Sequence, residues 1–274
     1  MSDFDDLMND PEDWVKEKKP VNHVIFVLDH SGSMTTITEI AKSSFNEQLQ
    51  TCKKESHDQD TFVSLIEFSD DAELVYREIP VDDVRELDGY YTDNMTALYD
   101  AIGLAVETFR DIPELTEEEN HSALVVIVTD GNENYSKDFK GESGRVRLKS
   151  LIEELKGTGK WTFTFLGAGQ DVMETAVEGM SIAAGNSMGF TATKDGYNVA
   201  NAQVCKGLTS FYSSRRVGAQ AVSNFYNDVQ DNTNDKEKWT NSNDKEKWTN
   251  SNSTEKWTNS NSTVKEDDVQ ENLT

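Results

Sequence analysis

The chain has 274 residues, 35% of them hydrophobic and 9% aromatic, so it can bury one sizeable α/β core but hardly two full domains. Its formal net charge of −25 repels phosphate backbones and anionic lipid head groups, which makes nucleic acid and membrane surfaces poor partners. The sequence shows neither an apolar run of membrane-spanning length nor a signal peptide, and Cys52 and Cys205 fit reduced thiols, so we expect a cytoplasmic protein.

Residues 1–20 are predicted to form a flexible acidic leader that ends on Pro20. A first apolar strand is expected at Val24–Leu28. After it, apolar residues at helical spacing predict a helix over about 36–55. Two strands then follow at Phe62–Phe68 and Ala72–Ile79. Only three residues separate these two strands, which predicts a hairpin and therefore an antiparallel edge strand.

The next segment alternates helix and strand. Apolar periodicity predicts a helix from Leu98 to Phe109, and a third helix around 148–155 that stops at Gly157. Strands are expected at Leu124–Val128 and Trp161–Leu166, almost wholly apolar, as in parallel strands covered on both faces. The pattern predicts an α/β fold with a doubly wound, mostly parallel sheet and one antiparallel edge strand.

The C-terminal part divides into a structured and a repetitive segment. We expect a helix from about Asp171, a short strand over Met188–Thr193 to complete a domain of residues 21–195, and a helical extension over 196–227 packed on that domain. Residues 228–274 hold nine-residue repeats such as NDKEKWTNS, with one Trp in each, and are predicted to be a disordered tail. Two interpretations of the tail stay open, a multivalent motif anchored by Trp or a tandem duplication without function.

The segment HVIFVLDHSGSM carries the clearest chemical signal. An apolar strand ends at Asp29, and Ser31 and Ser33 follow before a helix, which places a carboxylate and two hydroxyls where open α/β sheets bind ligands. Such hard oxygen ligands suit Mg²⁺ or Mn²⁺, and Gly32 would allow the tight turn between the hydroxyls. The same residue types could also serve only as a helix cap.

Two later segments favour the metal interpretation. DNMTALYDAI places Thr96 on a loop before a helix, and VVIVTDGNEN ends a buried strand at Asp130. Together with Asp29, Ser31 and Ser33, these segments resemble the metal-ion-dependent adhesion site of von Willebrand factor type A (VWA) domains, over about residues 21–195.

The resemblance implies hydroxyl ligands from Ser31, Ser33 and Thr96, and carboxylates of Asp29 and Asp130 that act partly through water. It also implies a coordination position left for a Glu or Asp of a partner protein, and hence a divalent-metal-dependent interaction module. The oligomeric state stays undetermined. Segments such as FNEQLQ and WTFTFLGAGQD are similar to small stand-alone bacterial and phage VWA proteins of the tellurite-resistance-associated type. Asn94 and Met95 stand where such relatives often carry glycines, so the loop is expected to sit differently.

Other interpretations of the motif were weighed. His30 is expected to face solvent or the partner rather than the ion, and His23, His57 and His121 are expected at the surface. A Mg²⁺-dependent phosphatase of haloacid-dehalogenase type needs a second acid two residues after the first, where Ser31 stands, so we expect no enzyme. A VWA scaffold with a purely structural metal is the remaining alternative.

Overall fold

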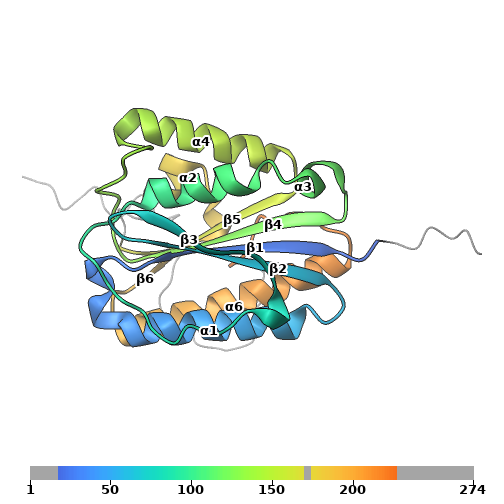
Figure 1. Ribbon diagram of the computed structural model, residues 1–274, viewed down its shortest axis with the longest axis horizontal. Helices are drawn as coiled ribbons and strands as arrows, with labels where there is room; N and C mark the ends of the chain where they lie inside the picture. The colour runs from blue at the N-terminus through green and yellow to red at the C-terminus, as the bar shows by residue number, and fades with distance from the viewer. Residues whose placement is uncertain (1–17, 170–173, 227–274) are drawn as a thin grey trace, which may run out of the picture. The chain divides into compact units, whose positions relative to one another are not determined.

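Residues 18–169 and 174–226, which the computed structural model of the protein describes, form a six-stranded sheet with helices on both faces (Figure 1). Most of the predicted leader and the whole repeat tail of residues 228–274 lie outside these residues, so those two predictions stay untested. No helix in the described ranges is long and apolar enough to span a membrane.

The sheet has the order β3-β2-β1-β4-β5-β6, and β3 is an antiparallel edge strand, as predicted from the hairpin. All other neighbouring strands are parallel. The α/β prediction is therefore confirmed. The strands are β1 (Val21–Asp29), β2 (Asp60–Phe68), β3 (Ala72–Pro80), β4 (His121–Thr129), β5 (Trp161–Ala168) and β6 (Ser187–Phe190).

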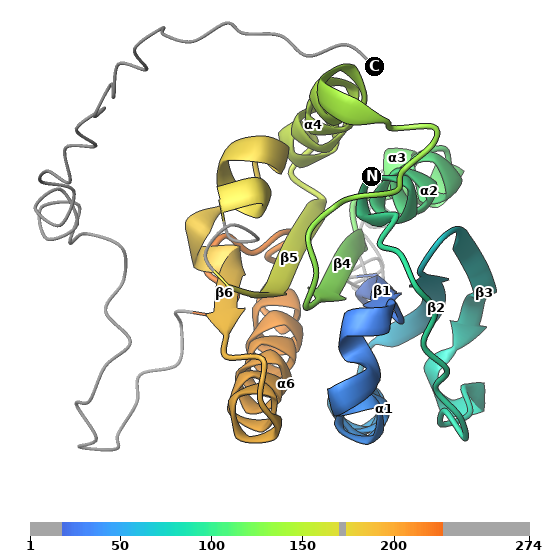
Figure 2. The same ribbon diagram turned by 90° about the vertical axis from the view of Figure 1, so that its left-hand side faces the viewer.

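Helices α1 (Thr38–Glu55) and α6 (Lys194–Arg216) cover one face of the sheet, and α2 (Leu98–Phe109), α3 (Pro113–Glu117) and α4 (Gly141–Gly157) cover the other (Figure 2). Four short helical turns complete the described elements: η1 (Gly32–Ile37), η2 (Val81–Asp83), η3 (Thr175–Gly179) and η4 (Ala184–Asn186). The segment 170–173, where another helix was expected to begin, is outside the described residues.

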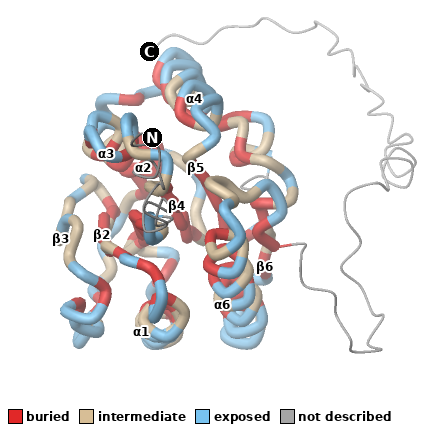
Figure 3. Tube along the Cα trace, turned by 90° about the vertical axis from the view of Figure 1, so that its right-hand side faces the viewer, coloured by how far each residue is buried: buried red, intermediate tan, exposed pale blue. Residues whose placement is uncertain are grey.

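The apolar run of β1 is explained by burial on both faces. Alternate side chains of this strand enter two separate cores, because successive residues of a strand point to opposite faces. Val24, Phe26 and Leu28 pack with residues of α1 and α6, and Ile25 and Val27 pack with residues of α2 and α4. Figure 3 shows the same division, with buried strands between helices whose outer surfaces are exposed.

Helix α6 ends at Arg216, so the expected helix to residue 227 is wrong in its last part. Gly218 has a φ of +88°, and its N–H donates to the carbonyl of Arg215 at 3.1 Å, a glycine cap that stops a helix. Residues 217–226 then return irregularly to the domain. Phe225 is fully buried there, and the Phe225 N–H donates to Asn186 Oδ1 at 2.8 Å. Residues 217–226 thus return to the domain without forming a helix.

Edge strand β3 is irregular. Its pairing with β2 shifts register on both sides of Leu65, and Glu78 has a φ of +50°, which is uncommon for a residue with a Cβ. The Glu78 N–H donates to the hydroxyl of Ser64 at 2.8 Å instead of joining a regular ladder. Glu78 therefore lies in a β-bulge that turns its side chain out of the normal alternation.

Candidate metal centre

The predicted ligands lie at the point where the strand order reverses. β1 sits between β2 and β4, and β1 and β4 run parallel, so their carboxyl ends share one edge of the sheet. Asp29 is the last residue of β1, and Asp130 directly follows β4. Ligands of open α/β sheets bind at such a reversal, so the topology brings the two carboxylates to a binding edge.

A chain of hydrogen bonds connects the predicted residues of the first loop to Asp130. Asp29 Oδ1 accepts from the backbone N–H of Ser31 at 2.7 Å, and the Ser31 and Ser33 hydroxyl oxygens are 3.1 Å apart. The Ser33 hydroxyl donates to Asp130 Oδ1 at 2.5 Å. These four residues and Thr96 are called the oxygen cluster below.

Thr96 reaches the oxygen cluster across Gly131. A Cβ added at Gly131 would lie 3.1 Å from Thr96 Oγ1 and 3.4 Å from Ser33 Oγ, so both hydroxyls border the same small space. Thr96 is buried, and Asn134 fixes it, because the Thr96 N–H donates to Asn134 Oδ1 at 2.9 Å. The structure thus brings all five predicted residues to one place, and Gly131 keeps a side chain out of it.

Several residues that position the oxygen cluster were missed from the sequence. The hydroxyl of Thr129 donates to Asp29 Oδ2 at 2.5 Å, so both oxygens of Asp29 are engaged. Glu133 accepts from the N–H of Tyr99 at 2.9 Å at the start of α2, and Asp70 accepts from the N–H of Met95 at 2.8 Å. Thr129 offered a signal, since it is a hydroxyl residue directly after a run of buried aliphatic residues. Asp70 and Glu133 offered none, because acids in loops are usually solvated.

The loop before Thr96 packs against the first motif. A Cβ on Gly32 would lie 3.0 Å from the carbonyl oxygen of Asp93, which is closer than most side chains approach, so glycine favours this contact. The φ of Gly32 is not in the left-handed region. The Asp93 N–H donates to the carbonyl of His30 at 2.9 Å. Nδ1 of His30 in turn donates to the carbonyl of Tyr91 at 3.0 Å. His30, expected to face solvent or the partner, is half-buried and holds this loop in place.

Burial makes the two carboxylates of the oxygen cluster costly to ionise. Asp29 is fully buried, and this burial raises its pKa to about 6. Hydrogen bonds from Thr129 and Ser31 lower the pKa and oppose this shift. The nearby charge of Asp130 raises the pKa further, but by less. Burial also raises the pKa of Asp130, although the hydrogen bond from Ser33 opposes this. A cation at this edge would offset the cost of ionising both groups.

The donor set fits a small, hard divalent cation. Its oxygens come from two carboxylates and three hydroxyls, which suit Mg²⁺ or Mn²⁺. Among residues 18–169 and 174–226, no three His, Cys, Asp or Glu side chains are grouped closely enough to hold a metal ion. An ion at the oxygen cluster would therefore depend on the hydroxyls of Ser31, Ser33 and Thr96 and on water.

Comparison with protein families agrees with this arrangement. Residues 24–133, which run from β1 to just beyond Asp130, match the model of the von Willebrand factor type A domain. This part of the chain is therefore similar to VWA domains. The match covers less than half of the chain but includes all five residues of the oxygen cluster. No curated protein sequence matches the chain significantly.

Solved structures that resemble the chain do so distantly. Proximal thread matrix protein 1 from the mussel byssus, described with a zinc-occupied MIDAS motif, is 16% identical with a TM-score of 0.48; the match covers 69% of this chain and 46% of that protein. The PilB minor pilin from Streptococcus sanguinis is 11% identical with a TM-score of 0.48, and the match covers 72% of this chain and 63% of that protein. The ArnB paralog VWA2 from Sulfolobus acidocaldarius is 16% identical with a TM-score of 0.44, and the match covers 69% of this chain and 45% of that protein. The chain thus spans less than two thirds of each.

Proposed function

We propose that the chain is a VWA domain that binds Mg²⁺ or Mn²⁺ at the oxygen cluster and, through the ion, a Glu or Asp side chain of a partner protein. The observation that carries this proposal is the convergence of two desolvated carboxylates and three hydroxyls from three loops at the reversal of strand order. When bound, the ion would supply a positive charge that attracts a carboxylate to a chain whose net charge of −25 otherwise repels it.

The burial of the cluster supports a division of roles among its residues. Asp29, Ser31 and Thr96 are buried, so they would hold the ion from the protein side. Ser33 is exposed and Asp130 is half-buried, so they border the side from which a partner can approach. Asp29 already binds Ser31 and Thr129 through both oxygens, which supports a role that is partly mediated by water.

The same geometry argues against phosphoryl transfer. A nucleophilic carboxylate needs an oxygen that a substrate can reach, whereas Asp29 is fully buried with both oxygens hydrogen-bonded. The residue two positions later is Ser31, and its hydroxyl contacts Ser33 rather than a His. We therefore propose that the chain is a binding module and not an enzyme. We also propose that it is related to the bacterial and phage tellurite-resistance-associated VWA proteins that its sequence resembles.

The proposal is tested with the full chain as an immobilised bait. Wild type, Asp29→Asn and the exposed control Asp82→Asn are compared in Mg²⁺ and in EDTA, and captured proteins are identified by mass spectrometry. We expect a partner that wild type and Asp82→Asn retain in Mg²⁺, that EDTA releases and that Asp29→Asn fails to capture.

Two results would contradict the proposal. If capture survives both EDTA and Asp29→Asn, a metal at the cluster does not mediate the contact. If instead an aryl phosphate is hydrolysed in a reaction that requires both Mg²⁺ and Asp29, the site is that of a hydrolase.

A further inference from the structure

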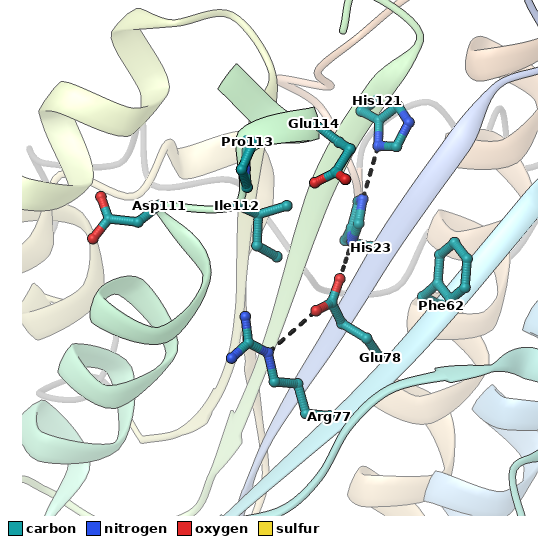
Figure 4. A pocket seen from close by; sticks show the side chains of 9 residues that line it. All are labelled: His23, Phe62, Arg77, Glu78, Asp111, Ile112, Pro113, Glu114 and His121. Carbon is teal, nitrogen blue, oxygen red and sulfur yellow. Dashed lines mark hydrogen bonds and ion pairs between the residues drawn. The ribbon is translucent and has the colours of Figure 1, made fainter. Parts of the chain in front are cut away.

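A second candidate site lies near the amino-terminal end of β1, far from the oxygen cluster. A cavity of about 440 Å³ is lined by His23, Glu78, Glu114 and His121, among others (Figure 4). His23 and Asp29 are on the same strand, six residues apart, which separates the two sites by about 20 Å. Nothing in the proposed metal-dependent function uses these residues.

His23 lies in the wall of this cavity and is buried, so the expectation that it lies at the surface is wrong. It is only 4% exposed, and its Nε2 is 3.1 Å from Nδ1 of His121. Nδ1 of His23 is 3.2 Å from Glu78 Oε1, yet the angle does not make a hydrogen bond, and this buried nitrogen has no hydrogen-bond partner. Burial lowers the pKa of His23 to about 4, so the ring is neutral at pH 7.

The role of Nδ1 depends on the tautomer of His23. If its proton is on Nε2, that nitrogen donates to His121 Nδ1, and Nδ1 of His23 keeps its lone pair. Two acceptors, Nδ1 and Glu78 Oε1, then lie 3.2 Å apart with no donor between them. Such a pair is unfavourable unless a donor from outside satisfies both atoms.

The bulge in β3 holds Glu78 in a strained backbone conformation beside His23. Its φ of +50° and the bulge in β3 direct the carboxylate toward His23, and strain of this kind in a residue with a Cβ is found at functional sites. The other oxygen of Glu78 pairs with Nε of Arg77 at 3.2 Å, so this guanidinium, which also lines the cavity, is held by Glu78 through one of its nitrogens.

Glu114 adds a third acceptor. Figure 4 shows its carboxylate turned toward the His23 ring, whereas that of Asp111 turns away. Glu114 is exposed, and in the part of the chain that the structure describes its carboxylate has no hydrogen bond or ion pair. The carboxylates of Glu78 and Glu114 are therefore the acidic groups of the cavity, which Arg77 and His121 also line, beside apolar walls from Phe62, Ile112 and Pro113.

We propose that this cavity binds an aliphatic ammonium group, either of a free amine or of a lysine side chain. An ammonium has three N–H donors, which can satisfy the carboxylates of Glu78 and Glu114 and, in the Nε2–H tautomer, Nδ1 of His23, and it has an alkyl stem for the apolar wall. A metal ion is less suitable, because ligands about 2 Å from one ion must lie close together, and the described residues contain no group of three His, Cys, Asp or Glu able to hold one.

The test measures binding of n-butylamine, putrescine and Nα-acetyl-lysine N-methylamide to the full chain, by calorimetry and by the NMR shifts of the His23 imidazole. Tetramethylammonium is the control ligand, since it has the same charge and no N–H donor. Glu114→Gln is compared with Glu117→Gln, an exposed acid of the same short helix outside the cavity, because a strongly acidic protein attracts any cation weakly.

We expect saturable binding of the amines that shifts the His23 resonances, and no such shift with tetramethylammonium. Glu114→Gln should weaken binding by about tenfold or more, the value of one charge-assisted hydrogen bond, and Glu117→Gln by less than about twofold. Glu78→Gly should abolish binding with a thermal midpoint no lower than that of wild type, because it relieves the strained φ. Tighter binding of putrescine than of the monoamines indicates a free polyamine as the source, and equal binding indicates a lysine side chain.

Equal effects of Glu114→Gln and Glu117→Gln would overturn the proposal, since binding would then be unspecific attraction to an acidic surface. So would a His23 shift with tetramethylammonium as large as that with butylamine. Binding of Zn²⁺ at micromolar concentration without binding of the amines would show a metal site instead.

Discussion

Replacement of Asp29 by Asn should stabilise the protein without metal and remove its response to Mg²⁺. The amide oxygen can still accept from Ser31 N, and the amide nitrogen can donate to Thr129 Oγ1, whose own proton can turn to the Gly131 carbonyl at 3.1 Å. The local hydrogen bonds therefore survive the change. Only the buried charge is lost.

The expected magnitude follows from the pKa of Asp29, which burial raises from 3.8 to about 6. Each tenfold change in a protonation equilibrium corresponds to about 1.4 kcal/mol, so the ionised carboxylate destabilises the metal-free protein at pH 7 by at most about 3 kcal/mol. About 1 kcal/mol shifts the midpoint of a domain of this size by roughly 2–4 °C, so Asp29→Asn should melt several degrees higher in EDTA.

Thermal melts in EDTA and in Mg²⁺ check this expectation. At a hundredfold excess of Mg²⁺ over its dissociation constant, wild type should gain about 2.7 kcal/mol and Asp29→Asn nothing, so the difference in stability between the two proteins nearly disappears. The exposed control Asp82→Asn should behave as wild type. The reasoning is refuted if Asp29→Asn keeps the Mg²⁺ shift, or if it melts below wild type in EDTA.

Four further predictions concern the rest of the molecule. His23 stays neutral in the folded protein to about pH 4 but gains a proton near pH 6.5 in the unfolded protein. Its contribution to stability is therefore lost as the pH falls through this window. Between pH 7 and 5, denaturant unfolding should show a loss of stability that is about 2 kcal/mol smaller for His23→Gln than for wild type. Phe225→Ala should cost about 3–5 kcal/mol in the same assay, since this ring is fully buried. Gly144→Ala should cost about 1–3 kcal/mol, because its Cβ would lie 2.0 Å from the backbone of Phe139. Deletion of residues 228–274 should leave the calorimetric affinity for Mg²⁺ unchanged; a weaker affinity would show that the tail supports the site.

The fold could be predicted because its signals are local. Each central strand is a continuous apolar run, as in β1, and the three-residue connection between β2 and β3 leaves only a hairpin. The predicted end of α6 is too late because the prediction extends the apolar stripe of Phe211 and Tyr212 past Gly218, which caps the helix. Burial of Phe225 depends on contacts with distant residues such as Asn186, which no local pattern encodes.

The candidate metal centre was predictable for the residues that provide oxygens directly, since Asp29 and Asp130 end apolar strands. The residues that position them were not, because Asn134 and Asp70 act through backbone N–H groups of another loop. His23 shows the same limit more sharply. An isolated His near the start of a strand looks like a surface residue until β3 and β4 bring Glu78 and His121 beside it.

The bulge at Glu78 also affects how the molecule behaves among copies of itself. A regular outer strand would present an even row of free N–H and carbonyl groups, to which a strand of another molecule could add. In β3 the register breaks twice along the strand, so the outer row of these groups is uneven. Charged residues such as Glu73 and Arg77 are exposed on the same strand. The irregularity that places Glu78 beside His23 therefore also makes this edge of the sheet less able to pair with a strand of another molecule.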